Sequence, residues 1–196
     1  MYTLLLLLIY LAFISLGLPD SLLGSAWPVM HKAFQVPLSY AGLVTMIISV
    51  GTICSSLMSE RLTKKFGTQI VTVFSVMLTA IALFGFSTAS AFWMLCLWAV
   101  PYGLGAGAID AALNNYVALH YNSRHMSWLH CFWGLGTIIS PYVMSYALTT
   151  SVWQNGYRMV SFIQIGITLI LFVTLPIWKV NKKETAQEEK AEGGDV

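Results

Sequence analysis

The chain has 196 residues, of which 57% are hydrophobic and 9% are charged, and its formal net charge is +2. A soluble domain carries about 25% charged residues, so this composition excludes an ordinary soluble fold and indicates a membrane protein. The charges form short clusters, and the absence of a long basic patch predicts no nucleic-acid partner.

Six segments are long and apolar enough to cross a lipid bilayer, which requires about 20 mostly apolar residues. The alternating pattern of membrane β-barrel strands is absent, so the spans are expected to be helices. The expected fold class is an all-α integral membrane protein, with a six-helix transmembrane bundle in residues 1–178. The spans cover about residues 2–27, 38–58, 68–88, 91–119, 126–149 and 156–178.

The first span contains Asp20, which follows Pro19 in the stretch GLPDSLLGSAWP. Two interpretations are open: a carboxylate near the outer interface that meets water, or a group that lines a cavity in a locally irregular helix. Arg158, at the outer end of the sixth span, is at a depth that would allow an ion pair with Asp20. No Lys or Arg precedes the first apolar stretch, so we expect a retained span rather than a signal peptide.

The charges of the connecting segments indicate the orientation of the bundle. The stretches ERLTKK and HYNSRH and the cluster from Lys179 to Lys183 fall on one side, whereas the other side holds mainly Lys32. Positive segments favour the cytoplasm, which predicts a multi-pass protein of the cell membrane with both termini in the cytoplasm. Residues 179–196 are charged and lack aromatic residues, and we expect them to form a disordered cytoplasmic tail.

The fourth span carries Asp110 inside an apolar run over residues 91–121, with Asn114 one helical turn later. A charged group at bilayer depth costs about 3 kcal/mol or more, so it normally faces a bundle interior or a water-filled cavity. One interpretation is a packing hydrogen bond to a neighbouring helix. The other is a protonation site, because desolvation favours the neutral form of a carboxyl group. The GLGAG stretch of residues 103–107 is expected to allow close helix packing rather than to bind a nucleotide, since no strand precedes it.

The fifth span places His130, Trp133 and Thr137 on one helical face. Such a histidine can serve as a helix–helix hydrogen bond alone, or it can line a sugar-type site in which rings stack and polar groups orient hydroxyls. His120, His125 and His130 do not share a face, and no HExxH or CxxC motif accompanies them. The sequence therefore predicts no metal and no cofactor. It also predicts no enzyme activity, since no Ser/His/Asp or Cys/His arrangement stands out.

Six spans with both termini inside and a charged link after the second span resemble the N-terminal half of a major facilitator superfamily transporter. In that family the link carries a glycine–acid–basic–glycine motif. Here the stretch ERLTKKFG keeps the basic residues and the final glycine, while a lysine stands where the acid is usual and a glutamate replaces the first glycine. The resemblance implies a conformational loop made of Glu60, Arg61, Lys64, Lys65 and Gly67.

A closer resemblance is to the fucose permease-like branch, whose members are sugar:proton symporters. Its fourth helix carries an acid followed four residues later by asparagine, as Asp110 and Asn114 do here, and its first-helix acid matches Asp20. Its fifth helix is similar to MSWLHCFWGLGTIIS, with His130 and Trp133 where that branch has a glutamine and an asparagine. The resemblance implies that Asp20, Asp110, Asn114, His130 and Trp133 face one central concavity as the substrate and proton pathway.

Members of this family have two six-helix halves, and the six spans supply one of them. Three arrangements are open: a truncated fragment, a split transporter completed by a second six-helix chain, or a parallel homodimer that mimics the two halves. The leading function is transmembrane transport of a small polar, sugar-like solute through the lipid bilayer, with a proton as candidate coupling ion. The alternative is a non-transporting membrane scaffold or interaction subunit, or an inactive fragment. The buried acid and amide favour transport, because a scaffold has no need of them.

Overall fold

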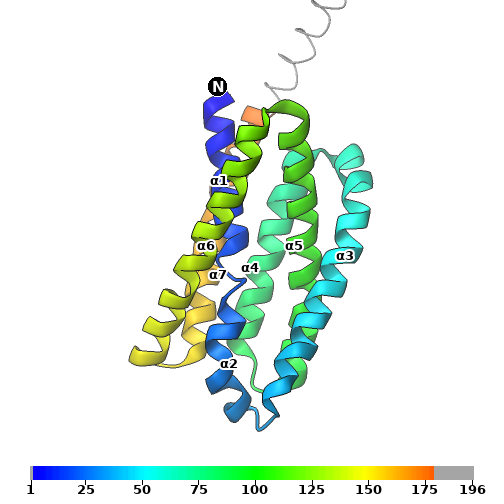
Figure 1. The fold of residues 1–196 in the computed structure, drawn as a ribbon. Helices are drawn as coiled ribbons and strands as arrows, with labels where there is room; N and C mark the ends of the chain where they lie inside the picture. Colours follow the sequence, from blue (N-terminus) through cyan, green and yellow to red (C-terminus); the bar gives the residue numbers. More distant parts are fainter. Residues whose placement is uncertain (1, 179–196) are drawn as a thin grey trace, which may run out of the picture.

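The computed structural model describes residues 2–178, and within them the chain is helical with no β-strand. The helices lie roughly lengthwise beside one another and are joined by short links (Figure 1). Six helical units are long and apolar enough to cross a membrane, which confirms the all-α six-span fold. The elements in chain order are α1 (Tyr2–Gly17), α2 (Leu22–Ala33), the short 3-10 helix η1 (Leu38–Tyr40), α3 (Ala41–Phe66), α4 (Thr68–Thr88), α5 (Phe92–His120), α6 (Ser123–Thr150) and α7 (Trp153–Val173).

The first span is broken into two helices, whereas the sequence predicted one span over residues 2–27. Between α1 and α2, residues 18–21 form a turn. The Asp20 amide donates to the Gly17 carbonyl at 3.3 Å, and the Leu22 amide donates to the Pro19 carbonyl at 3.1 Å. Pro19 has no N–H group to continue the helical pattern, so the chain turns here and resumes as α2. The spanning unit reaches Ala33, well beyond residue 27.

Several helices extend past the predicted spans because hydropathy marks where a chain leaves the apolar layer, not where its helix ends. The predicted second span stops at residue 58, yet α3 continues through the charged stretch to Phe66. The residues of the expected conformational loop are therefore the last turns of a helix, and only Gly67 links α3 to α4. Gly67 has a φ of +89°, a backbone conformation that favours glycine.

The last span begins and ends earlier in the chain than the sequence predicted. We expected residues 156–178, but α7 begins at Trp153 and ends at Val173. A proline at position 176 cannot donate the backbone hydrogen bond that would continue the helix, which accounts for the early end. The charged tail predicted from residue 179 onward lies outside the described residues.

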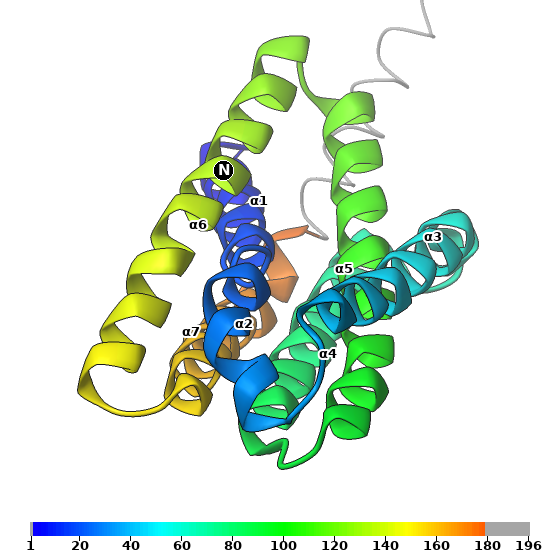
Figure 2. The same ribbon diagram turned by 60° about the horizontal axis from the view of Figure 1, so that its bottom comes forward.

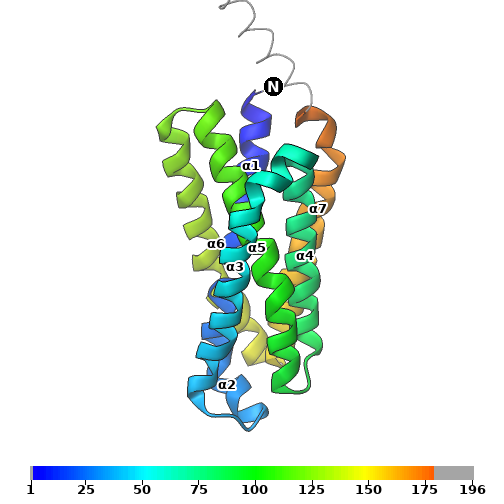
Figure 3. The ribbon, with the colours of Figure 1, turned by 90° about the vertical axis from the view of Figure 1, so that its right-hand side faces the viewer.

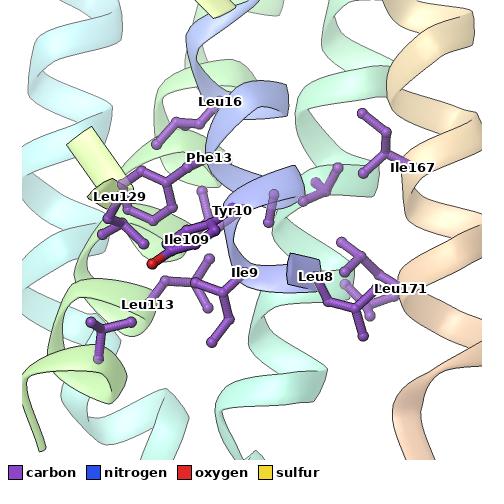
Figure 4. Packing of buried hydrophobic residues seen from close by; sticks show 14 of the residues in the cluster. Leu8, Ile9, Tyr10, Phe13, Leu16, Ile109, Leu113, Leu129, Ile167 and Leu171 are labelled. Carbon is purple, nitrogen blue, oxygen red and sulfur yellow. The ribbon is translucent and has the colours of Figure 1, made fainter. Parts of the chain in front are cut away.

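The α1 helix lies at the centre of one hydrophobic core. Leu5, Ile9 and Phe13 recur every four residues on α1, so they share one face, and all are fully or almost fully buried. The other buried members of this cluster come from four other spans, several of which are visible in Figure 4. They include Val73 and Val76 of α4, Ile109 and Leu113 of α5, Leu129 of α6, and Ile167 and Leu171 of α7.

Close contact between α3 and α5 depends on the glycines of α5. A Cβ added at Gly103 would meet the Ile48 carbonyl oxygen, and one added at Gly107 would meet the Thr52 carbonyl oxygen. Hydroxyl groups of α3 donate to α5 carbonyls along the same seam, as small and polar residues do between membrane helices. This confirms the packing interpretation of the GLGAG stretch. The donors are Thr52 and Ser55 to Gly103, Ser56 to Gly107 and Ser59 to Ala108, over 3.1–3.5 Å.

The packing leaves two spans outermost. Figure 2 shows α1 and α6 on one side of the bundle and α3 and α5 on the other. Among the six spans, α3 and α6 bury the least of their surface within the bundle. Both helices expose many large apolar side chains, which for a spanning helix means contact with lipid or with another protein.

Candidate functional site

A cavity of about 330 Å³ lies among α1, α3, α5 and α6, and four of the five predicted site residues line it. These four are Asp20, Asp110, His130 and Trp133. Asn114, the fifth, is not part of the lining but bonds to one of the four. The other lining residues are Phe13 and Leu16 of α1, Ile48 and Thr52 of α3, and Tyr102 and Ala106 of α5.

Asp110 is held by its own helix. The Asn114 side-chain amide donates to Asp110 Oδ1 at 2.9 Å and to the Asp110 carbonyl oxygen at 3.0 Å. Residues four apart lie on the same face of an α-helix, so this contact follows from helix geometry alone. In the described residues these bonds come from α5 itself, so the structure offers no interhelical bond to support a purely packing role. The Asp110 carboxyl group is instead oriented at the cavity wall.

Asp20 is held by two other spans. The Tyr102 hydroxyl donates to Asp20 Oδ1 at 3.1 Å, and the Trp133 indole Nε1 donates to Asp20 Oδ2 at 2.8 Å. Both oxygens therefore have a neutral donor, one from α5 and one from α6. The ion pair with Arg158 that depth alone would allow is not found among the described residues, and the Arg158 guanidinium instead donates to Asn155 Oδ1 at 3.5 Å.

Sequence reasoning missed Tyr102, the residue that ties Asp20 to α5. Tyr102 is only 5% exposed, and a buried tyrosine hydroxyl usually finds a hydrogen-bond partner. That rule could have marked Tyr102 as a polar contact. It could not have named Asp20, which lies 82 positions away in the chain.

Trp133 and His130 present rings to the cavity. Trp133 keeps 38% of its surface exposed while its nitrogen bonds to Asp20, so part of the ring remains accessible. His130 packs edge-on against Phe13, with ring centroids 6.2 Å apart. Thr137, which shares their face in the sequence pattern, donates its hydroxyl to the Gly134 carbonyl at 2.8 Å and is not in the lining.

The lining contains two acidic side chains and neither lysine nor arginine among the described residues. A concave surface with one sign of charge attracts ligands of the opposite sign and opposes those of the same sign. The site as described is therefore unsuited to an anionic solute. Within residues 2–178, no three His, Cys, Asp or Glu side chains gather as a metal-binding group.

The residues predicted to form a conformational loop lie outside this cavity. Lys64 Nζ and Glu60 Oε1 form an ion pair at 2.6 Å, and both side chains are more than 70% exposed. An exposed pair of this kind adds little to stability, because water screens the two charges. Lys65 places its Nζ 5.2 Å from the centre of the Phe66 ring. Arg61 is exposed on the same turns of α3.

A second polar cluster, also missed from the sequence, lies outside the cavity lining. Gln164 of α7 accepts a hydrogen bond from Thr79 Oγ1 at 3.1 Å and donates one to the Ser15 carbonyl at 2.6 Å. These bonds join α7 to α4 and α1. Gln164 is 1% exposed, and its amide has partners for both its oxygen and its nitrogen, so the cluster fixes the packing of these spans.

Comparisons with known proteins place the chain in a family. It is 23% identical over 189 residues to the bypass of stop codon protein 6 of Saccharomyces cerevisiae, covering 94% of this chain and 38% of that protein. It is 22% identical over 182 residues to a glucose/mannose transporter of Bacillus subtilis, covering 91% of this chain and 44% of that protein. The chain thus spans less than half the length of each relative. The family pattern described as Major Facilitator Superfamily matches residues 9–195, and with its six membrane-length helices the chain is a multi-pass membrane protein that belongs to the major facilitator superfamily.

Proposed function

We propose that this chain takes part in transport of a small polar, sugar-like solute, with the central cavity as the solute site. The observation that carries the proposal is that Asp20 and Asp110, two acids within spanning segments, line one cavity. Keeping a carboxyl group at such depth costs several kcal/mol, and a non-transporting scaffold would gain nothing from two of them. The six-helix fold and the family support the same general activity.

The chemistry of the cavity supports a neutral solute rich in hydroxyl groups. Carboxyl oxygens accept hydrogen bonds from hydroxyls, and the exposed part of the Trp133 ring offers a surface on which a sugar ring can stack. Thr52 and His130 add polar groups at other points of the wall. The similarity to a protein named a glucose/mannose transporter agrees with this class of solute, as does the resemblance to the fucose permease-like branch.

We assign the coupling proton to Asp110. A carboxyl group in a low-dielectric cavity favours its neutral form, and access to water from alternate sides would load and release the proton. Asn114 would keep the carboxyl group oriented in both protonation states, because it bonds to the Asp110 side chain from the same helix. Asp20, whose oxygens already accept hydrogen bonds from two neutral groups, would bind the solute instead.

A second six-helix unit would complete the site. The α3 and α6 helices, which both line the cavity, also carry exposed apolar residues that such a unit could cover. Three sources of this unit are open: the same polypeptide, a separate chain or a parallel second copy. Two copies can pack in parallel because six spans return the chain to its starting side. The most exposed of these residues are Met46, Ile53 and Leu57 on α3 and Ile138 and Tyr142 on α6.

We propose that the protein lies in the cell membrane with both termini in the cytoplasm. The end of the bundle that carries the N-terminus also carries the α3–α4 and α5–α6 links (Figure 1). Arg61, Lys64, Lys65 and Arg124 lie near those links, whereas Lys32 and Arg158 lie toward the opposite end. The excess of positive residues at the first end supports this orientation.

Uptake into proteoliposomes, with a panel of sugars and with or without a pH gradient, tests the function. In the purified protein, Asp110→Asn should abolish pH-driven accumulation, by at least about tenfold, while solute counterflow stays measurable. Glu184→Gln, which makes the same acid-to-amide change in the charged C-terminal segment of the sequence, is the matched control and should transport like the parent. If Asp110→Asn accumulates solute as well as the parent, Asp110 is structural. If no partner chain, dimer or pH gradient yields uptake, the scaffold or inactive alternative replaces transport.

A further inference from the structure

An apolar groove lies on the outside of the bundle, next to the link between α3 and α4. Its volume is about 320 Å³, and its walls are Leu62 and Phe66 of α3 and Ile70 and Phe74 of α4. Figure 3 shows these two helices joined at the end of the bundle where the chain begins, with α5 between them farther along. The floor is Ala108 of α5, which is 6% exposed. The groove is therefore a crevice between helices and not a flat face.

The groove opens away from the central cavity. Its floor residue, Ala108, is two residues from both Ala106 and Asp110, which line the cavity. Residues two apart lie on nearly opposite sides of a helix, so α5 separates the groove from the solute site. Phe74, on the outer wall, is 71% exposed. In a chain that spans the bilayer, an apolar crevice on this side meets lipid.

The groove has a cationic rim. Lys65 Nζ lies 5.2 Å from the centre of the Phe66 ring, which is itself a wall of the groove. Among residues 2–178 the ion pair at this end joins Lys64 to Glu60, so the Lys65 ammonium group is not neutralised by that carboxylate. An apolar crevice that ends at a cation matches a molecule with an acyl chain and an anionic head.

We propose that this groove binds an anionic phospholipid from the adjacent leaflet. An acyl chain would lie between Leu62 and Phe74, and the phosphate group would contact Lys65. A positive residue near a membrane surface contributes about 1 kcal/mol of attraction to anionic lipid, which is about fivefold in affinity. This binding does not depend on whether the central cavity transports a solute.

The test compares two lipids with the same acyl chains in the purified protein. Dioleoyl phosphatidylglycerol or dioleoyl phosphatidylcholine is titrated into detergent-solubilised protein, and native mass spectrometry measures the lipid retained. The parent should retain the anionic lipid about fivefold more strongly. Lys65→Gln should remove most of that preference, whereas Lys32→Gln, at the opposite end of the bundle, should keep it.

A second pair of variants tests the groove itself. Phe74→Ala should lower retention of both lipids without changing their ratio, because it removes a wall and no charge. Phe172→Ala, at a 60% exposed position on α7, is the control and should change neither. All four side chains are exposed, so melting temperatures without lipid should match the parent. Equal effects of Lys65→Gln and Lys32→Gln, or of Phe74→Ala and Phe172→Ala, would overturn the proposal. So would a protein dimer that Phe74→Ala dissociates, since a second copy would then occupy the groove.

Discussion

Two aspartates in one cavity are held in different ways, and the difference bears on what each can do. The donor to the Asp110 carboxyl group comes from its own helix, so that group keeps its orientation if α5 moves as a rigid body. The donors to Asp20 come from α5 and α6, so its hydrogen bonds depend on how those spans sit relative to the α1–α2 turn. Any motion that separates these spans would therefore free Asp20 before it frees Asp110.

The Tyr102 hydroxyl is predicted to position Asp20 for solute binding. Tyr102→Phe removes one hydrogen bond and leaves the ring in its buried site. A hydrogen bond to a charged group contributes about 1.5–3 kcal/mol, so affinity for the solute found in the uptake screen should fall about tenfold. Isothermal titration or counterflow at varied solute concentration would measure it.

Tyr157→Phe is the matched control for this change. Tyr157 is also buried, at 2% exposure, but its hydroxyl is not one of the two donors to Asp20. The affinity of the Tyr157→Phe variant for the solute should stay near that of the parent protein. Equal losses in both variants would mean that Tyr102 acts through packing rather than through the Asp20 carboxyl group.

At the scale of the elements, the contact between α3 and α5 shows why glycine is needed in α5, which is the fourth span. Side-chain hydroxyls of α3 reach the carbonyl oxygens of α5 only because no Cβ stands between the two backbones. The same helix presents Tyr102, Ala106 and Asp110 to the cavity on the adjacent face. The position of α5 against α3 thus also sets the width of the cavity.

Gly107→Ala is predicted to destabilise the bundle. The added methyl would meet the Thr52 carbonyl oxygen and Ser55 Oγ, so α3 and α5 must move apart. Overpacking of this kind typically costs about 1–3 kcal/mol, and thermal unfolding in a mild detergent should show a lower melting temperature. Gly134→Ala is the control, because a Cβ there meets nothing within 4 Å. If the two variants melt alike, the contact between α3 and α5 is not the reason for the glycine.

For the molecule as a whole, the charge difference between the two ends predicts a single orientation in the membrane. With the three native cysteines, Cys54, Cys96 and Cys131, replaced, a cysteine at Ser123 should resist a membrane-impermeant thiol reagent applied to intact cells. A cysteine at Ser90, in the α4–α5 link at the other end, should react. Ser123 lies at the start of α6 beside Arg124, where positive charge favours the cytoplasm. Labelling of position 123 from outside would contradict the orientation.

The sequence alone was sufficient to predict the features that depend on residues close together in the chain. Apolar length predicted the six spans, and the spacing of four residues predicted that Asp110 and Asn114 would share a helical face, because both follow from helix geometry and the thickness of the bilayer. The glycines of residues 103–107 likewise predicted close packing, since a residue without a side chain inside a spanning helix has few other uses. Hydropathy placed the helix ends poorly, because a helix continues through polar residues such as Glu60 and Lys64 after it leaves the apolar layer.

Only the tertiary structure decided which spans enclose the cavity and which residues complete it. The bonds from Tyr102 and Trp133 to Asp20 join positions 82 and 113 apart in the chain, and Gln164 reaches Ser15 across 149 positions. No local pattern encodes such pairs, because they arise from how the faces of whole helices pack against one another. The α1–α2 turn, signalled in the sequence only by Pro19, acquires its role in the same way, since Asp20 becomes a cavity residue when α5 and α6 supply its donors.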